Sequence, residues 1–350
     1  MPHKVLFIGG SLNQTTMMHQ IASKLPGADC FFSPYYADGF VGLATRLQLT
    51  NFSVLGGNHR RDTEQYLDKH GLQVDYGGKL HDYDLVYTCS DNILPRNIQK
   101  KRVILVQEGM LEAETWVYHL VRALKLPRWF CDTAATGLSD GYDVFCVASP
   151  GYRDLFVRKG VNADKVVVTG IPNFDDAQKY RDNTVAARGF ALVATSSLRE
   201  TMKYDDREKF LASVGDLAAG REIIFKLHPN ENHPRAIAEI RRYFPSEPIL
   251  TSGSLHEMIA NCDIFIAQTT TAVFTAMQLG KQVYSYHNSE ELRKLLPIQN
   301  GGRSSERIAE IGRHLLETPL TEVRWNRKKS RILQRKWRLA EKRRLTSPAA

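Results

Sequence analysis

The feature that most constrains the fold of this chain is the alternation of short apolar runs with longer amphipathic stretches. The runs, such as KVLFIGG and EIIFKLHP, are nearly continuous in apolar residues. Such runs are typical of parallel strands that are covered on both faces. We predict strands at residues 4–10, 52–57, 84–90, 102–109, 143–149 and 165–171, and a second series at 190–197, 222–229, 248–253, 263–268 and 282–287.

The length and the two series of strands predict two domains. The chain has 350 residues, which suits two domains better than one. Amphipathic stretches between the runs supply crossover helices, so each series predicts a doubly wound, Rossmann-like α/β sheet. Residues 170–189 contain Gly, Pro, Asn and Asp with little apolar periodicity, which indicates a linker, and we place it at 173–189. We expect domains at 1–172 and 190–320, followed by a basic C-terminal helix at 321–350.

The positive charge is concentrated in the C-terminal segment. The net charge is +9, but residues 324–344 contain eleven Lys and Arg and one acidic residue, so the rest of the chain is close to neutral. Without a basic face on the body, nucleic acid is not an expected partner. Trp325, Leu333 and Trp337 interleave with the cations, and such a helix can lie on an anionic membrane surface. The alternative is a terminal helix that packs on the first domain.

The sequence predicts a cytoplasmic protein. No stretch approaches the ~18–20 consecutive apolar residues that a membrane span needs. The N-terminal residues lack a basic region followed by a cleavage site, so we expect no signal peptide. The five cysteines are scattered and odd in number, which indicates reduced thiols rather than a disulfide framework.

The stretch KLHPNE marks the end of one predicted strand. Lys226 and His228 stand at its carboxyl edge, where doubly wound sheets present residues to ligands, and Pro229 fixes the chain direction after them. An imidazole at such a place can donate to a phosphate oxygen. The alternative is a simple turn.

Three consecutive threonines, Thr269, Thr270 and Thr271, follow another predicted strand and open a predicted helix. The first backbone N–H groups of a helix are unpaired and its dipole favours an anion there. Hydroxyls add further donors. The alternative is an ordinary N-cap, which needs only one of the three.

A third group of residues lies at strand tips in the first half of the chain. One strand ends in Gln107, Glu108 and Gly109, which places a carboxylate well for a general base. The alternative is a helix-start acid. The first strand runs into Gly9, Gly10 and Ser11 without a G-x-G-x-x-G pattern, so we expect a loop of an acceptor cleft and no dinucleotide site.

Aspartates precede several predicted strands. Asp84, Asp143 and Asp263 each stand just before a strand, where a carboxylate can accept hydrogen bonds from loop donors. Asp82 and Asp84 form a D-x-D pair, but at the wrong end of the strand for a ligand site. The sequence therefore predicts no metal site and no cofactor.

Together, the E-G strand tip, the K-x-H-P stretch and the threonine cluster before a helix resemble the GT-B glycosyltransferases that use CMP-activated sugars. These include bacterial polysialyltransferases and Kdo-type transferases. GIPN at 170–173 and SLHEMIANCDIFI at 254–266 add to the resemblance. The layout is also similar to that of the CDP-glycerol glycerophosphotransferases, where the strand tip carries His-Gly.

The resemblance implies a role for each matched residue. Glu108 would deprotonate the acceptor hydroxyl, His228 with Lys226 nearby would hold the donor phosphate, and Thr269 and Thr270 would bind the same phosphate. Ser254 or its neighbours would touch the base or ribose. The chain departs from the family where Gln107 replaces the first acid and threonines replace serines. A glutamate in place of the strand-tip histidine favours a sugar transferase over a polyol-phosphate transferase.

The resemblance predicts an inverting, metal-independent glycosyltransferase. Its donor would be a CMP-sugar or a UDP-sugar, and its acceptor a glycan or a lipid-linked glycan. One alternative is a UDP-N-acetylhexosamine 2-epimerase-like enzyme, which normally has several cleft acids and a Gly-rich segment that TTTAVFTAM lacks. Another is a non-catalytic binder of nucleotide-sugars or polyanions.

Overall fold

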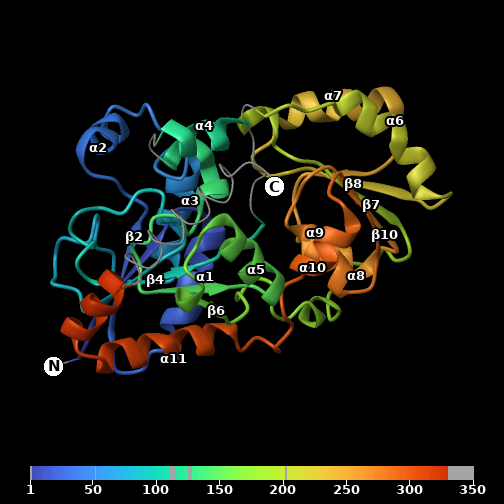
Figure 1. Ribbon diagram of the computed structural model, residues 1–350. Coiled ribbons are helices and arrows are strands. Elements are labelled where there is room, and N and C mark those ends of the chain that lie inside the picture. Colours follow the sequence, from blue (N-terminus) through green and yellow to red (C-terminus); the bar gives the residue numbers. More distant parts are fainter. Residues whose placement is uncertain (1, 52, 111–115, 125–127, 202, 330–350) are drawn as a thin grey trace, which may run out of the picture. The chain divides into compact units, whose positions relative to one another are not determined.

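The computed structural model describes residues 2–51, 53–110, 116–124, 128–201 and 203–329 (Figure 1). The chain forms two compact units. One consists of residues up to 175 together with the chain from 297 onward, and the other of residues 176–296.

The first unit is built on a parallel sheet. Among the described residues, six strands lie in the order β2-β1-β3-β4-β5-β6. The strands are β1 (Lys4–Gly9), β2 (Asp29–Pro34), β3 (Leu85–Thr88), β4 (Arg102–Val106), β5 (Val144–Val147) and β6 (Val166–Val168). The helices are α1 (Leu12–Ala22), α2 (Gly39–Arg46), α3 (Gly57–Lys69), α4 (Trp116–Leu124), α5 (Pro150–Lys159) and α11 (Ser304–Glu317), with short turns η1 (Arg128–Ala135) and η2 (Ala163–Lys165).

Local sequence signals set the ends of these helices. Ser149 caps α5 by accepting from the backbone nitrogen of Tyr152, and Pro150 occupies the first helical position. Gly160 ends the helix with a φ of 102°, a left-handed conformation that glycine adopts without a Cβ clash. The crossover after β5 is therefore fixed at both ends by its own sequence.

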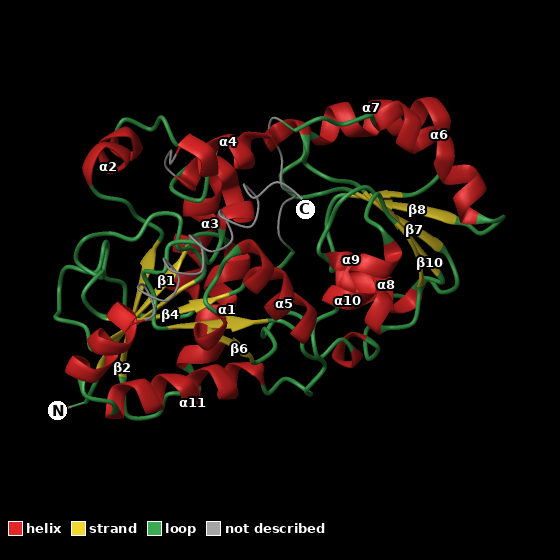
Figure 2. Cartoon of the chain, in the orientation of Figure 1, coloured by secondary structure: helices red, strands yellow, loops and turns green. Residues whose placement is uncertain are grey.

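The second unit is a smaller parallel sheet with the strand order β11-β10-β7-β8-β9 in the described part of the chain. Its strands are β7 (Ala191–Ala194), β8 (Ile223–Lys226), β9 (Ile249–Leu250), β10 (Ile264–Ala267) and β11 (Gln282–Tyr284). Its helices are α6 (Arg207–Ala218), α7 (His233–Tyr243), α8 (Leu255–Asn261), α9 (Ala272–Gln278) and α10 (Ser289–Leu295), with turns η3 (Gln178–Tyr180) and η4 (Arg199–Thr201). In Figure 2 the strands of this unit run between α6 and α7 on one side and α8 to α10 on the other.

One predicted strand is wrong, and one strand of the sheet was not predicted. The apolar run at 52–57 was expected to be a strand, but the described part, 53–56, is a turn that leads into α3. Leu55 is nevertheless buried, which accounts for an apolar residue in this turn. The strand beside β1 is β2 instead, and its register pairs Val5 with Cys30 and Phe7 with Phe32.

The C-terminal boundary of the second unit also differs from the expected limit at residue 320. The chain returns to the first unit at Pro297, and α11 packs there. A Cβ at Gly312 would lie 1.8 Å from the hydroxyl of Tyr87 on β3, so only glycine allows this approach. The amphipathic pattern of α11 shows that one face is buried, but it does not show which sheet buries it.

The start of the basic segment packs on the first unit. A helix follows from residue 320 and is described to residue 329, where Val323 and Arg327 are buried while Trp325 is 64% exposed. Arg327 forms an ion pair with Asp143 and donates from Nη1 to the carbonyl of Gln99 at 2.8 Å. The described part therefore fits the packing alternative. Residues 330–344, which hold most of the predicted membrane-binding charge, lie outside the described residues.

The aspartates before the strands do accept from neighbouring backbone. Asp84 Oδ2 accepts from the nitrogen of Lys4 at 3.0 Å, and Asp143 Oδ2 accepts from that of Val103 at 2.8 Å. Both nitrogens belong to the starts of the adjacent strands β1 and β4, so these bonds tie down neighbouring strands and do not come from the expected loop donors. In the described parts of the chain, no helix is long and apolar enough to cross a membrane.

Candidate functional site

Each sheet has one point where the direction of strand addition reverses. In the first unit β2 and β3 lie on opposite sides of β1, so the reversal falls between β1 and β3. In the second unit β8 and β10 lie on opposite sides of β7, so it falls between β7 and β10. Ligands of open parallel sheets bind outside the carboxyl ends of the strands at such a point. The residues that follow these strands are therefore the first place to look for a site.

In the first unit, Glu108 meets the loop after β1. Its Oε1 accepts from Ser11 Oγ at 2.9 Å, and its Oε2 accepts from Gln14 Nε2 at 2.5 Å. Gln14 is 5% exposed, and its Oε1 accepts from the backbone nitrogen of Gly10 at 2.7 Å. Because a backbone N–H can pair only with the amide oxygen, the amide nitrogen of Gln14 must face the carboxylate. The predicted residues Ser11 and Glu108 are thus brought together.

Sequence reasoning missed Gln14. It lies in the first turn of α1, where Ser11 caps the helix by accepting from the backbone nitrogen of Gln14. A polar residue at that position reads as an exposed helix residue. The only available signal was its distance of one helical turn from a strand-end glycine.

The glycines of this loop allow close packing. A Cβ at Gly9 would come within 2.6 Å of Thr15 Oγ1, and one at Gly10 within 2.9 Å of Val54 Cβ. Both residues are buried. They therefore allow the start of α1 to pack against the strand end. Of the three residues predicted to contact an acceptor here, Ser11 is the one whose side chain could do so.

The structure gives Gln107 a different place from the predicted one. Its side chain is 1% exposed, its Oε1 accepts from the backbone nitrogen of Ala148 at 2.9 Å, and its Nε2 donates to the carbonyl of Gly109 at 2.8 Å. Gln107 fastens the end of β4 to the end of β5 and does not line an open cleft. Glu108 and Gly109, by contrast, are half-buried.

In the second unit, the predicted residues after β8 and β10 are joined through the end of β7. The backbone nitrogen of His228 donates to Thr195 Oγ1 at 3.1 Å, and Ser196 Oγ donates to the carbonyl of Thr269 at 2.9 Å. His228 and Thr269 therefore lie at one sheet edge, at the reversal point. Thr195 and Ser196 were not predicted, although T-S-S directly after the apolar run ALVA was a usable signal.

The stretch KLHPNE forms a turn at a strand end, as the alternative interpretation expected, and the anion-binding role of His228 stays a prediction. The nitrogen of Glu231 donates to the carbonyl of His228 at 3.1 Å, with Pro229 second in the turn. The nitrogen of Asn230 donates to His228 Nδ1 at 3.1 Å. In the neutral imidazole, that bond places the proton on Nε2 and makes Nε2 a donor.

Lys226 is not an open anion ligand in this structure. Its side chain is 5% exposed and its Nζ donates to the carbonyl of Leu227 at 3.1 Å. Burial lowers the pKa of this lysine. A buried ammonium at the sheet edge still adds positive potential there, but the predicted direct contact does not fit its position.

The threonine cluster is half-buried, and the hydroxyl of Thr270 accepts from the backbone at the start of α9. Thr270 Oγ1 accepts from the backbone nitrogen of Ala272 at 3.2 Å, while the side chain of Thr271 makes no cap bond. Ser254 caps α8 by accepting from the nitrogen of Glu257 at 3.3 Å, in the loop that follows β9. The N-cap residue is Thr271, so the N-cap alternative is not met by a side-chain bond, and Thr270 instead accepts from the first residue of the helix. The phosphate role of the cluster and the base or ribose role of Ser254 stay predictions.

Comparison with known proteins places the chain by its fold. No family model matches the sequence. No curated protein is detectably similar to it. Among solved structures, UDP-GlcNAc 2-epimerase from Neisseria meningitidis bound to UDP-GlcNAc superposes with a TM-score of 0.56 at 12% identity, covering 89% of this chain and 100% of that chain. S. aureus MnaA with UDP gives 0.53 at 13% identity, covering 94% and 91%.

A third structure, the wall teichoic acid polymerase TagF, gives a TM-score of 0.48 at 10% identity, covering 90% and 88%, and carries no weight. The TM-scores of the first two structures indicate a shared fold. Sequence identities this low leave the chemistry of this chain open. The chain has the predicted α/β fold with two Rossmann-like units.

Proposed function

We propose that the protein is an enzyme that uses a nucleotide-activated sugar, and that it is an inverting glycosyltransferase. The observation that carries the proposal is that the side chains able to do this chemistry lie where the topology of each sheet predicts a ligand site. Glu108 in the first unit, and the hydroxyl and imidazole donors of the second, stand at the carboxyl edges of their sheets. The fold neighbours whose structures hold UDP-GlcNAc or UDP support a nucleotide-sugar as the ligand class.

In this proposal Glu108 is the general base. The acceptor hydroxyl gives its proton to the Glu108 carboxylate, and its oxygen bonds to the anomeric carbon of the donor. The bond from that carbon to the phosphate oxygen breaks with its electron pair on the phosphate. Ser11 and Gln14 hold the carboxylate, which is the arrangement that a positioned base requires.

The donor phosphate is assigned to the second unit. Negative charge develops on the leaving phosphate, so donors fixed in advance stabilise the transition state more than the ground state. His228, the backbone at the start of α9 and the threonine hydroxyls are the proposed donors, and buried Lys226 contributes potential. The donor is a CMP-sugar by the sequence resemblance, with a UDP-sugar as the alternative base.

Transfer to a surface glycan or a lipid-linked glycan completes the proposal. A lipid-linked acceptor would be held at a membrane, and the basic residues at 324–344 would hold the enzyme on the same anionic surface. Arg327 is excluded from this role by its ion pair with Asp143. The membrane contact is therefore assigned to the cations beyond it.

A second candidate is a UDP-N-acetylhexosamine 2-epimerase, which the fold of the N. meningitidis enzyme favours. The two are separated by incubating the protein with CMP-, CDP- and UDP-sugars, with and without glycan acceptors. Transfer releases nucleotide in proportion to the acceptor that is glycosylated. Epimerisation converts the donor sugar to its epimer and needs no acceptor. Nucleotide binding without turnover of any donor would indicate a binding protein. The variant Glu310→Gln, at an exposed position of α11, is the control. If Glu108→Gln is inactive and Glu310→Gln is active, the turnover belongs to the site that contains Glu108.

A further inference from the structure

The turn that carries His228 is supported from below by a chain of buried polar contacts. The backbone nitrogen of His228 donates to Thr195 Oγ1, and the Thr195 hydroxyl donates to Glu231 Oε2. Arg207 donates from Nη2 to Glu231 Oε1 at 2.6 Å. Thr195, Glu231 and Arg207 are 4%, 6% and 4% exposed, so this support lies inside the unit.

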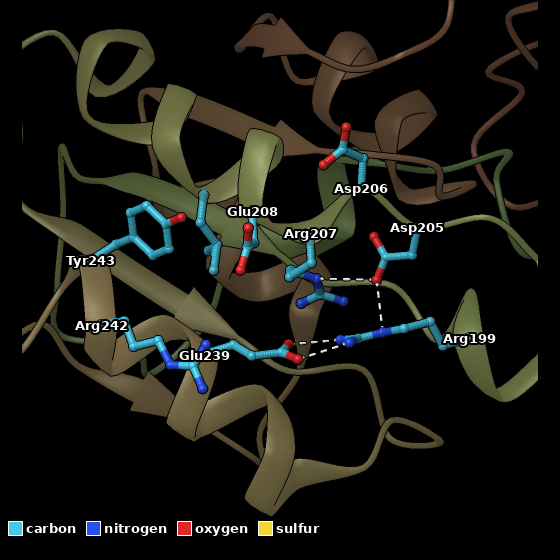
Figure 3. A pocket seen from close by; sticks show the side chains of 9 residues that line it. Arg199, Asp205, Asp206, Arg207, Glu208, Glu239, Arg242 and Tyr243 are labelled. Carbon is cyan, nitrogen blue, oxygen red and sulfur yellow. Dashed lines mark hydrogen bonds and ion pairs between the residues drawn. The ribbon is translucent and has the colours of Figure 1, made fainter.

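Arg207 is itself held by other groups of the same edge. It donates from Nη2 to the carbonyl of Ser196 at 3.1 Å, and its Nε lies 3.3 Å from Asp205 Oδ2. Asp205 also contacts Arg199, which grips Glu239 on α7 with two bonds of 2.7 Å (Figure 3). These residues surround a cavity of about 220 Å³. The loop after β7 is thus fastened both to α7 and to the turn at His228.

A turn of this kind does not need a buried ion pair. Pro229 and the bond from Glu231 nitrogen to His228 carbonyl are enough to form it. Burying a carboxylate and a guanidinium costs desolvation energy that their attraction offsets only when the geometry is good. Here one oxygen of Glu231 accepts from Thr195, and Nη2 of Arg207 donates to the carbonyl of Ser196, so the pair contacts both residues that follow β7. The ion pair therefore holds the end of β7 and the turn at His228 in place, which formation of the turn alone does not require.

We infer that Glu231, paired with Arg207, is a positioning residue that sets the place of His228 through the Thr195 hydroxyl. The inference rests on the proposed role of His228 as a phosphate ligand. With Nδ1 held by the nitrogen of Asn230 and the backbone held by Thr195, the imidazole has one orientation for its Nε2 donor. A donor held in one orientation binds a phosphate oxygen without a further loss of freedom.

The test measures the gain in affinity that a phosphate adds, as the ratio of dissociation constants for uridine and UMP, and for cytidine and CMP, by calorimetry. We expect His228→Ala to lower this ratio by about tenfold or more, the range for a hydrogen bond to a charged group. Thr195→Val removes both bonds of the hydroxyl at nearly constant volume and should lower the ratio by a similar factor. Thr195→Ser should restore it. Thr63→Val, a buried threonine of the first unit, should leave it unchanged.

The outcomes separate the two claims. If wild-type protein shows no phosphate-dependent gain with either base, the proposed donor site is wrong. If His228→Ala loses the gain while Thr195→Val keeps it, only the positioning role is overturned and the chain of contacts is structural.

A second pair decides the case if Thr195→Val does not fold. In an Arg207→Met background, which leaves no buried unpaired guanidinium, Glu231→Gln keeps an oxygen for the Thr195 hydroxyl and should keep the ratio, while Glu231→Ala should lower it about tenfold. Equal ratios in these two variants would reject the inference.

Discussion

The side-chain amide of Gln14 bridges the backbone of Gly10 and the carboxylate of Glu108, accepting at 2.7 Å on one side and donating at 2.5 Å on the other. The strand-end glycine thereby dictates which end of the amide meets the carboxylate. The bridge joins residues 94 positions apart in the chain. It is the contact from which a role for Glu108 gains most support.

Replacing the proposed base should abolish turnover without unfolding the protein. Glu108→Gln keeps the size of the side chain, and its oxygen can accept from Gln14 while its amide nitrogen donates to the Ser11 hydroxyl, so we expect the fold and nucleotide binding to persist. Loss of a general base lowers rates by about 10²–10⁴-fold. The measurement is kcat with the donor that the incubations identify. Transfer at the wild-type rate would remove Glu108 from the mechanism.

Gln14→Leu should separate positioning from chemistry. The variant loses the donor to Glu108 and leaves the nitrogen of Gly10 without its partner, which costs about 1–3 kcal/mol of stability. We expect kcat to fall less than in Glu108→Gln, with KM for the donor nearly unchanged, because the donor is assigned to the other unit. The two kinetic constants and a urea melt measure these effects. A rise in KM with unchanged kcat would contradict the assignment.

These residues also show where sequence reasoning succeeded and where it could not. The apolar runs located most strands, because parallel strands buried on both faces are continuous in apolar residues. Glu108 and Ser11 were found as strand-end residues. Gln14 was missed because its partner is fixed only when α1 and β4 meet. The buried state of Lys226 could not be read from KLHPNE, since a strand-end lysine has the same pattern whether exposed or covered.

The placement of α11 can be tested through its glycine. Gly312→Ala would put a Cβ against the Tyr87 hydroxyl, so α11 must shift away from β3. We expect a loss of about 1–3 kcal/mol in unfolding free energy, as for overpacking in a core. Gly215→Ala on α6, where no atom lies within 4 Å of the new Cβ, is the matched control and should be neutral or stabilising. Equal stability of the two variants would argue against α11 packing on the first unit.

His256 should make the protein sensitive to mild acid. Its ring stacks on Tyr180 at 4.8 Å, its Nδ1 is buried without a hydrogen-bond partner among the described residues, and burial together with nearby Lys179 lowers its pKa to about 4. The unfolded histidine has a pKa near ~6.5, so the unfolded state binds the proton first as pH falls from about 6.5 toward 4. Stability is therefore lost over that window, by about 2 kcal/mol at pH 5.

The measurement is urea unfolding at pH 8 and at pH 5. His256→Phe keeps the stack on Tyr180 and removes the titrating group, so its stability should fall less between the two values. His314→Phe, at an exposed position of α11, is the control and should behave as the wild type. An unchanged loss in His256→Phe would assign the acid sensitivity to other groups.

The last prediction concerns the basic C-terminal segment. Arg327 is buried against Asp143, and removing one member of a buried ion pair typically costs about 3–5 kcal/mol. A chain that ends before Arg327 should therefore be unstable for reasons unrelated to membranes. A chain that ends at Lys329 keeps this contact and loses seven of the nine Lys and Arg between Arg327 and residue 345. We expect it to stay folded, with the melting temperature of the full chain.

Sedimentation with vesicles of graded anionic lipid then isolates the proposed membrane role. Each basic residue near an anionic leaflet contributes about 1 kcal/mol, and salt screens that attraction. Full-length protein should sediment with anionic vesicles at low salt and be released by high salt, while the chain ending at Lys329 should stay in the supernatant. Equal binding of both chains would place the membrane contact elsewhere. If neither chain binds at any lipid composition, an acceptor in solution is favoured over a lipid-linked one, because nothing would hold the enzyme where such an acceptor lies.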